Sequence, residues 1–182
     1  MVARVTPRAI VIHHYDPVWP ELFERERPRV APLLGAASVA IEHVGSTAVP
    51  GLAARPCVDM VAGLDDVRAA GPAAIAALVG AGWLDLAATG PPSPGGRALM
   101  RPGPQGDAFH LQLVEYGGTD WVDALLFRDY LRRHPRAALA YQQLKHVLAD
   151  RSADRATYGE GKSGFFTSIM ELARLERAAG RL

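Results

Sequence analysis

Two short apolar runs on either side of a glycine-containing turn constrain the fold of this chain more than any other feature. Residues 39–44 and 57–62 are apolar and partly β-branched, which is typical of buried strands. The segment between them opens with Gly45-Ser46 and also contains Pro50, Gly51 and Pro56, which indicates a loop or broken turn. The pattern predicts two neighbouring strands, with Gly45 and Ser46 at the end of the first.

The remaining patterns predict further strands and two helices in the first two thirds of the chain. The additional strands are expected at residues 9–13, 82–87, 97–101 and 108–116, the last two paired across the turn at 102–106. In residues 108–116 strict alternation places Phe109, Leu111 and Leu113 on one face, and His110, Gln112 and Val114 on the other. One helix is expected after Asp16, bending or ending early at Pro28 and Pro32, and a second at 65–78. Residues 89–96 are expected to form a flexible loop.

The last third of the chain is predicted to be helical. One helix is expected from Thr119 or Asp120 to His134, and Pro135 suits the first turn of the next. The expected core faces of the last two helices are Tyr141, Leu144, Val147 and Leu148, and Phe165, Ile169, Leu172 and Leu175. Strands first and helices afterwards predict an α+β fold, with a mixed sheet backed by helices and a helical C-terminal third. The length of 182 residues suits a single domain spanning residues 1–182.

Charge and cysteine content narrow the classes of partner. Twenty basic and nineteen acidic residues give a net charge of +1, which lacks the basic excess needed to coat bulk nucleic acid. The single cysteine, Cys57, allows no internal disulfide and fits a reducing cytoplasm. Residues 1–15 contain no apolar stretch of signal-peptide length, and no segment has the length of a membrane span. The sequence therefore predicts a cytoplasmic protein with a small-molecule partner, and it leaves the oligomeric state open.

The strand, turn and strand also carry chemistry. A glycine at the end of a strand lets a phosphate approach the backbone closely, and turn N–H groups with the Ser46 hydroxyl can donate to it. Asp59 lies inside the second strand, where its carboxylate can hold a Mg²⁺ ion that bridges phosphates. The arrangement predicts a phosphate and metal site around Gly45, Ser46 and Asp59.

The same residues resemble the signature of the GrpB family. The resemblance begins with residues 41–47, 49–52, Pro56 and Asp59, and continues through His110-Leu111 and residues 126–132 to Tyr141, Lys145, Tyr158 and Lys162. GrpB proteins are assigned to the nucleotidyltransferase superfamily by their Gly-Ser and the downstream aspartate. The resemblance spans most of the chain and implies a nucleotidyltransferase-like fold with a nucleotide site.

Two positions depart from a working nucleotidyltransferase. Such an enzyme has a second carboxylate two positions after the first, and a third on a later strand, to hold two Mg²⁺ ions. Here Val61 stands in the second position, and His110 and Gln112 face inward on the later strand. A single carboxylate is a poor cage for two metal ions, which makes two-metal catalysis doubtful.

The candidate site residues fall into three groups. The catalytic candidates are Asp59, which is also the candidate Mg²⁺ ligand, and His110, because histidine exchanges protons near neutrality. The candidates for binding phosphate or nucleotide are Gly45, Ser46, Thr47, Arg55, Arg128, Lys145, Tyr158 and Lys162. The candidates for lining the pocket are His43 and Gln112.

Each candidate has a structural alternative. Asp59 can pair with Arg55 or Arg128, since a buried carboxylate needs a partner. His43 can be a strand histidine with a satisfied hydrogen bond, and the basic run from Arg128 to Arg136 can be a solvated helix face. Residues 156–163 match a relaxed P-loop pattern, but no strand precedes them, so we interpret the match as chance.

Two functions follow. The first is a Mg²⁺-assisted nucleotidyl transferase acting on a small molecule, with a metal-free variant that uses histidine and lysine. The second is a module that binds a nucleotide, coenzyme or other phosphorylated compound, or a protein partner, without chemistry. Val61 and Gln112 favour the second.

Overall fold

The two strands predicted around the glycine-containing turn are neighbours in a five-stranded mixed sheet. The computed structural model describes residues 10–88, 97–104, 106–152 and 154–182. The strands are β1 (Ser38–Val44), β2 (Cys57–Leu64), β3 (Leu84–Asp85), β4 (Arg97–Pro102) and β5 (Ala108–Glu115), in the order β1-β2-β5-β4-β3. β2 and β5 are parallel, and the other neighbouring pairs are antiparallel.

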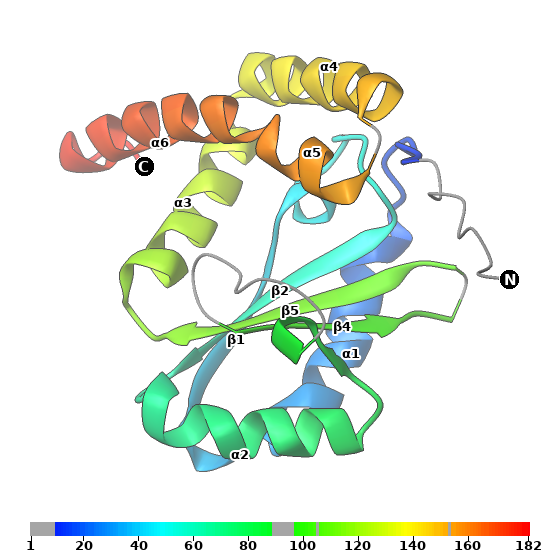
Figure 1. Ribbon diagram of the computed structural model, residues 1–182. Helices are drawn as coiled ribbons and strands as arrows, with labels where there is room; N and C mark the ends of the chain where they lie inside the picture. The colour runs from blue at the N-terminus through cyan, green and yellow to red at the C-terminus, as the bar shows by residue number, and fades with distance from the viewer. Residues whose placement is uncertain (1–9, 89–96, 105, 153) are drawn as a thin grey trace, which may run out of the picture.

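Helices cover both faces of this sheet (Figure 1). α1 (Val18–Leu34) and α2 (Val67–Gly80) pack against each other and against one face. α3 (Thr119–Arg133) packs on the other face, and α4 (Pro135–Arg151), α5 (Arg155–Glu160) and α6 (Ser163–Ala178) extend the helical layer beyond it. Short 3₁₀ turns also lie at Gly35–Ala37, Ser46–Ala48 and Leu86–Ala88. The α+β architecture and the helical C-terminal third are confirmed.

Strand alternation decides which residues face which helical layer. Phe109, Leu111 and Leu113 of β5 join the large hydrophobic core beneath α1 and α2. His110 and Gln112 face the opposite side, where Val114 packs with Trp121 of α3. The predicted division of β5 into two faces is therefore confirmed, and it turns His110 toward the C-terminal helices.

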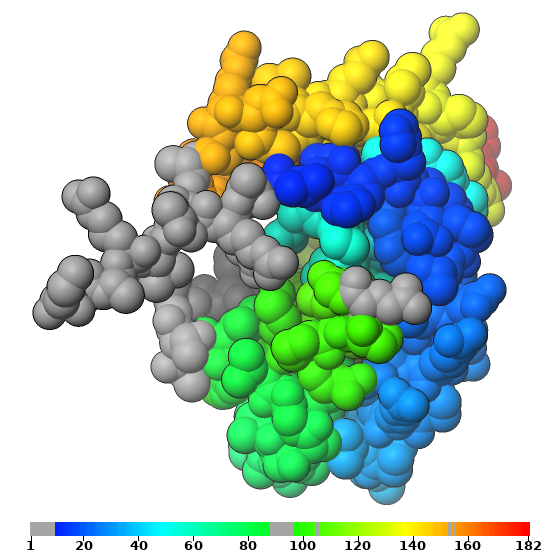
Figure 2. Space-filling model, turned by 90° about the vertical axis from the view of Figure 1, so that its right-hand side faces the viewer, coloured from blue at the N-terminus to red at the C-terminus, as the bar shows by residue number. Residues whose placement is uncertain are grey.

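The opening strand predicted at residues 9–13 is absent as a strand. From residue 10 on, this segment makes a single antiparallel bridge, in which His13 exchanges two backbone hydrogen bonds with Ala54 at 2.8 and 2.9 Å. Figure 2 shows these residues in dark blue, lying across the cyan segment before β2. The strand predicted at 82–87 shrinks to the two residues of β3, and the loop predicted at 89–96 lies outside the described residues.

The first helix does not end at its prolines. α1 continues past Pro28 and Pro32 to Leu34. The two prolines lie four residues apart on the exposed face, where water can satisfy the carbonyl groups that lose a backbone donor. The opposite face buries Trp19 and Val30, so packing against the sheet outweighs the local proline penalty.

The core faces of the last helices differ in part from the prediction. In α6 the buried residues are Ile169, Met170 and Ala173, whereas Leu172 and Leu175 are exposed. In α4 the buried residues are Tyr141 and Lys145, and Val147 is exposed. α5 is not predicted by the sequence pattern. Within the described ranges, no helix has both the length and the apolar character needed to cross a membrane.

A buried ion pair ties α1 to the sheet and gives the first prediction. Glu26 of α1 is 2% exposed, and its Oε2 lies 2.5 Å from Arg101 of β4 and 3.6 Å from Arg29. The Arg29 side chain is 71% exposed, whereas Arg101 packs over the rings of Trp83 and Phe109. Burial raises the pKa of Glu26, and the two arginines oppose this effect.

We expect Arg101→Leu to lower the free energy of unfolding by about 3 kcal/mol, because it leaves a buried carboxylate without its close partner. Arg29→Leu is the matched control, since it removes an exposed partner of the same carboxylate and should cost less than about 1 kcal/mol. Urea unfolding of both variants measures the difference. Equal losses would contradict a dominant role for Arg101.

Candidate functional site

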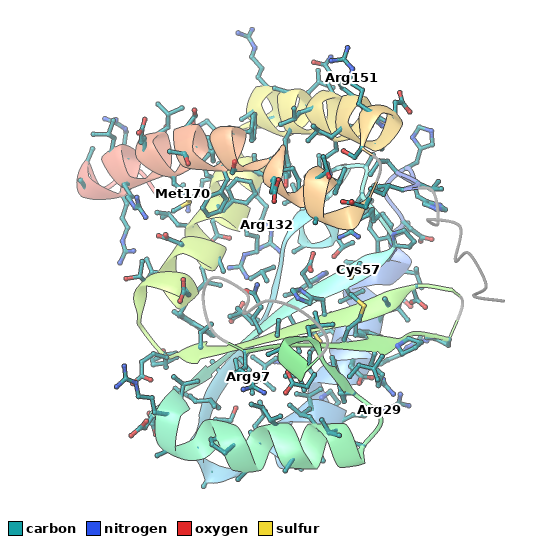
Figure 3. All side chains as sticks on the ribbon, viewed as in Figure 1. Arg29, Cys57, Arg97, Arg132, Arg151 and Met170 are labelled. Carbon is teal, nitrogen blue, oxygen red and sulfur yellow. The ribbon has the colours of Figure 1, made fainter. Side chains whose placement is uncertain are left out.

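A cavity of about 300 Å³ opens between the end of the sheet and the C-terminal helices. Its floor is formed by the turn after β1 and by side chains of β2 and β5, and its walls by α3, α4, α5 and the start of α6. In Figure 3, the labelled Cys57 marks the end of β2 that lies beneath α5. Nine predicted residues line this cavity: Gly45, Ser46, Arg55, Asp59, His110, Gln112, Lys145, Tyr158 and Lys162.

Asp59 and His110 form the centre of the floor. The parallel register of β2 and β5 places them directly side by side, and His110 Nδ1 lies 3.0 Å from Asp59 Oδ1. Burial alone would raise the pKa of Asp59, but the hydrogen bond from His110 and the charges of Arg55 and Lys162 hold it below its ordinary value. An ionised carboxylate only accepts hydrogen bonds, so Nδ1 of His110 carries the donated proton. Nε2 is then the imidazole nitrogen left to exchange a proton with a ligand.

Gly45 is required by the position of Asp59. Residue 45 has φ 69° and ψ −167°, a backbone region open almost only to glycine. A Cβ at residue 45 would lie 2.9 Å from the Asp59 Cβ and closer still to Oδ2. The missing side chain therefore lets the end of β1 close over the Asp59 carboxylate.

Three cationic side chains converge on this single carboxylate. Arg55 comes from the loop before β2, Lys145 from α4, and Lys162 from the residue that precedes α6. The Arg55 guanidinium and the Lys162 ammonium lie 5.5 and 4.7 Å from the ring centroid of Tyr158. The faces of aromatic rings attract cations, so Tyr158 helps to hold two like charges in one pocket.

Lys145 is the most deeply buried of the three cations, with 2% of its surface exposed. Its Nζ donates to the backbone carbonyl of Ala53 and lies 4.9 Å from the ring centroid of Tyr141, one helical turn earlier. Within the described ranges it makes no salt bridge with a carboxylate. Burial, reinforced by the charge of Lys162, lowers the pKa of Lys145 to about 7, against the opposing effect of Asp59.

Three predicted residues lie away from the cavity. Strand parity turns His43 to the opposite face of the sheet, where it stacks on Phe23 at 5.0 Å, and burial lowers its pKa to about 4. Thr47 is buried, and its Oγ1 lies 3.0 Å from His43 Nε2 and donates to the Cys57 carbonyl at 3.2 Å. These contacts match the structural alternative for His43, a strand histidine with a satisfied hydrogen bond, and Thr47 is its hydrogen-bond partner.

Arg128 is the third of these residues. It donates to Glu42 at 2.8 Å, to the His43 carbonyl at 3.0 Å and to Asp129 at 2.7 Å. The Glu42 and His43 contacts fasten α3 to β1. Arg132, one turn later, donates to the Ala48 carbonyl at 2.9 Å and is labelled in Figure 3. This part of the basic run is therefore used in joining the helical layer to the sheet.

Aromatic residues of the pocket were missed by the sequence reasoning. Tyr141, predicted as a core residue, lines the cavity beside Phe127 and Phe166. Burial raises the pKa of Tyr141, and the charges of Tyr158 and Asp59 add to this effect. Lys145 lies four residues after Tyr141 on an otherwise apolar helix face, and this was the local signal that the helix lines a polar pocket.

The donor set fits an anion better than a resident metal ion. Within the described ranges, no group of three histidine, cysteine or acidic side chains could hold a cation. One oxygen of Asp59 already accepts from His110, and three cationic residues share the pocket with this carboxylate. A Mg²⁺ ion at Asp59 remains a prediction.

The segment that matches a relaxed P-loop pattern is helical. Residues 155–160 form α5, and α6 begins at Ser163 after a short turn. The element directly before α5 in the described part of the chain is the helix α4 rather than a strand, in keeping with a chance match. Tyr158 of α5 and Lys162 of the turn nevertheless both line the cavity.

Comparison with known proteins agrees with this architecture. The family described as GrpB protein matches residues 9–172. A UPF0157 protein of Streptomyces coelicolor is 34% identical over 169 residues, which are 92% of this chain and 86% of that protein. UPF0157 protein YqkA of Bacillus subtilis is 31% identical, and this chain spans about half of its length, 48%. A crystal structure of GrpB from Enterococcus faecalis superimposes with a TM-score of 0.75 at 29% identity, covering 90% of this chain and 96% of that one.

Fold and pocket thus define an α+β protein with a cationic cavity at the end of a mixed sheet. The family match over residues 9–172 and the identities above 30% extend the likeness over most of the chain. The chain belongs to the GrpB family.

The Gly45 contact gives the second prediction. We expect Gly45→Ala to cost more than about 2 kcal/mol of unfolding free energy, because both the backbone conformation and the contact with Asp59 oppose a side chain. Gly51→Ala is the matched control: its φ is 78°, but a Cβ there meets nothing within 4 Å, so about 1 kcal/mol is expected. Thermal and urea unfolding measure both. Equal costs would show that the Asp59 contact is not limiting.

Burial of Lys145 gives the third prediction. Its pKa is about 7 in the folded chain and near 10.5 when unfolded, so between these values only the unfolded state binds the proton. The free energy of unfolding therefore rises with pH across this window, and the cost of burying the amine is fully present below pH 7.

We expect Lys145→Met to be more stable than the wild type at pH 6.5 by about 2 kcal/mol, after allowance for the lost hydrogen bond to Ala53. The advantage should shrink toward pH 10. Urea unfolding at pH 6.5, 8 and 10 provides the test. A difference between the two proteins that does not change with pH would contradict a lowered pKa.

Proposed function

We propose that this protein binds a nucleotide or another phosphorylated small molecule in the cavity around Asp59. The observation that carries the proposal is the convergence of Arg55, Lys145 and Lys162 on a pocket with one carboxylate. Bringing three cations together in a partly buried cavity is unfavourable unless an anion completes the charge balance. A phosphate group supplies two negative charges and several acceptor oxygens, which suits these donors.

The shape of the cavity supports a small ligand. A volume of about 300 Å³ is at the lower end of the range for ligand pockets. Phe127, Tyr141 and Phe166 line it beside the charged groups, so an apolar or aromatic part of the ligand has a surface to pack on. Ser46 lies in the turn next to Asp59 and adds a hydroxyl to the polar side.

Transfer of a nucleotidyl group to a small acceptor is the second candidate function. It is supported by the Asp59–His110 pair, in which the carboxylate orients the imidazole and leaves Nε2 to accept a proton from an attacking hydroxyl. The strand, Gly-Ser turn and strand with an aspartate also support a relationship to the nucleotidyltransferase superfamily. A Mg²⁺ ion that binds together with a triphosphate would have one carboxylate ligand in the pocket, Asp59. The cationic residues of the pocket favour binding of the phosphate groups without a metal ion. A cytoplasmic location belongs to the same proposal.

Thermal unfolding with a panel of ligands tests the proposal. The panel contains nucleoside triphosphates, coenzyme A and inorganic phosphate, each with Mg²⁺ and with EDTA. A ligand that binds only the native state raises the melting temperature. We expect stabilisation by at least one phosphorylated ligand, retained in EDTA, and a roughly tenfold or greater loss of affinity in Lys162→Gln.

The controls separate binding from chemistry. Arg25→Gln removes an exposed cation of α1 that pairs with Glu21, and it should leave affinity unchanged. Samples from the panel are also analysed for released pyrophosphate and new products with a mixture of hydroxyl acceptors. Product that requires Mg²⁺ and disappears in Asp59→Ala would favour the metal-assisted transferase. No stabilisation by any phosphorylated ligand would contradict the proposal.

A further inference from the structure

The two lysines of this chain share one pocket. Of twenty basic residues, eighteen are arginines, and Lys145 and Lys162 are the only lysines in the sequence. Both line the cavity around Asp59. Arginine binds phosphate at least as well as lysine, so phosphate binding alone gives no reason to keep lysine at these positions in an arginine-rich chain. An amine differs from a guanidinium in that it can lose its proton and act as a nucleophile.

The surroundings of the two lysines differ. Lys162 and Arg55 both lie near the ring of Tyr158, where they form a pair of cations on the more exposed side of the pocket. Lys145 is almost fully buried, contacts the ring of Tyr141 and donates to the Ala53 carbonyl. Burial among apolar groups and a neighbouring ammonium are the conditions that keep an amine neutral and nucleophilic. The lowered pKa of Lys145, about 7, agrees with this geometry.

We propose that Lys145 forms an imine with the carbonyl group of a phosphorylated aldehyde or ketone, whose phosphate is held by Arg55 and Lys162. The inference rests on the proposed function, because it assigns the substrate class of the same phosphate site. A carbonyl carbon is the electrophile that suits this pocket, since its reaction with an amine releases only water.

The pocket contains the proton donors and acceptors that the step needs. The Nζ lone pair forms a bond to the carbonyl carbon, and the C=O pair moves to oxygen, which is protonated to give a carbinolamine. Burial raises the pKa of Tyr141, so its hydroxyl stays protonated and can donate to this oxygen. Nε2 of His110 can accept a proton that Nζ releases.

The step closes without a further reactant. The nitrogen lone pair then forms the C=N bond and expels the oxygen as water. Both protons lost by Nζ leave in that water molecule, Tyr141 and His110 return to their starting states, and no oxidant or reductant is consumed.

Borohydride trapping tests the proposal. The full chain is incubated with pyridoxal 5′-phosphate as the phosphorylated aldehyde probe, reduced with sodium borohydride and mapped by peptide mass spectrometry. We expect the reduced adduct on Lys145 rather than Lys162, with a labelling rate that rises as the pH passes through about 7. An ordinary exposed lysine would react substantially only at much higher pH.

Matched probes and variants separate the reactivity of the Lys145 amine from the binding of the phosphate by Arg55 and Lys162. Pyridoxal without phosphate should label Lys145 at least about tenfold less, and inorganic phosphate should compete with the phosphorylated probe. Lys145→Arg keeps a positive charge and should abolish the adduct while retaining phosphate binding. Lys162→Arg retains a cation that can bind the phosphate, so the adduct should still form on Lys145. Circular dichroism and melting temperature check that both variants fold.

The outcomes distinguish the two proposals. Phosphate binding measured by calorimetry without an adduct on Lys145 would overturn the imine and leave the proposed function standing. An adduct on Lys145 that forms equally with both probes, and with which inorganic phosphate does not compete, would confirm a reactive amine. It would overturn the assignment of Arg55 and Lys162 as the residues that hold the phosphate of the substrate. Preferential labelling of Lys162, or a pH dependence like that of an exposed lysine, would also overturn the proposal.

Discussion

The site depends on the partly buried Asp59 carboxylate, which lies between the Gly45 backbone and the His110 imidazole. Three strands meet at this point: β1 ends at Val44, β2 carries Asp59 and β5 carries His110. The carboxylate gains a hydrogen bond from His110 and the nearby charges of Arg55 and Lys162, which offset the cost of removing it from water. Its side chain remains 35% exposed toward the cavity, so the same carboxylate is structural and accessible.

The cationic residues are the counterpart of this carboxylate, but they exceed it in charge. Tyr158 and Tyr141 place aromatic faces beside them, which reduces the repulsion without neutralising it. The unbalanced charge has two consequences. It favours an anionic ligand, and it adds to the larger effect of burial in lowering the pKa of Lys145, so that the deepest amine of the pocket is chemically different from its neighbours. The charges of Arg55 and Lys162 therefore contribute both to the affinity for phosphate and to the reactivity of the amine, and burial is the larger cause of the reactivity.

The fold was largely predictable because its elements follow local rules, and the failures come from packing. Alternation in β5 correctly separated Phe109 and Leu111 from His110, since neighbouring side chains of a strand must face opposite sides. The prolines of α1 misled because local penalties take no account of where a residue lies: Pro28 and Pro32 are on the solvent side of a helix held by its opposite face. Leu172 and Leu175 were wrongly expected in the core, because the spacing of apolar residues along a helix does not say which of two apolar stripes another element will cover.

The sequence by itself determined the strand, Gly-Ser turn and strand, the family, the position of Asp59 within the second strand, and the inward direction of His110. These follow from periodicity and from residue types with few conformational substitutes, such as Gly45. Only the tertiary structure decided which cations reach the pocket. Arg55, Lys145 and Lys162 do, whereas Arg128 is held by Glu42 and Asp129. The physical reason is that the direction of a strand side chain is set by its own backbone, while the partner of a helix side chain depends on how distant helices pack onto the sheet.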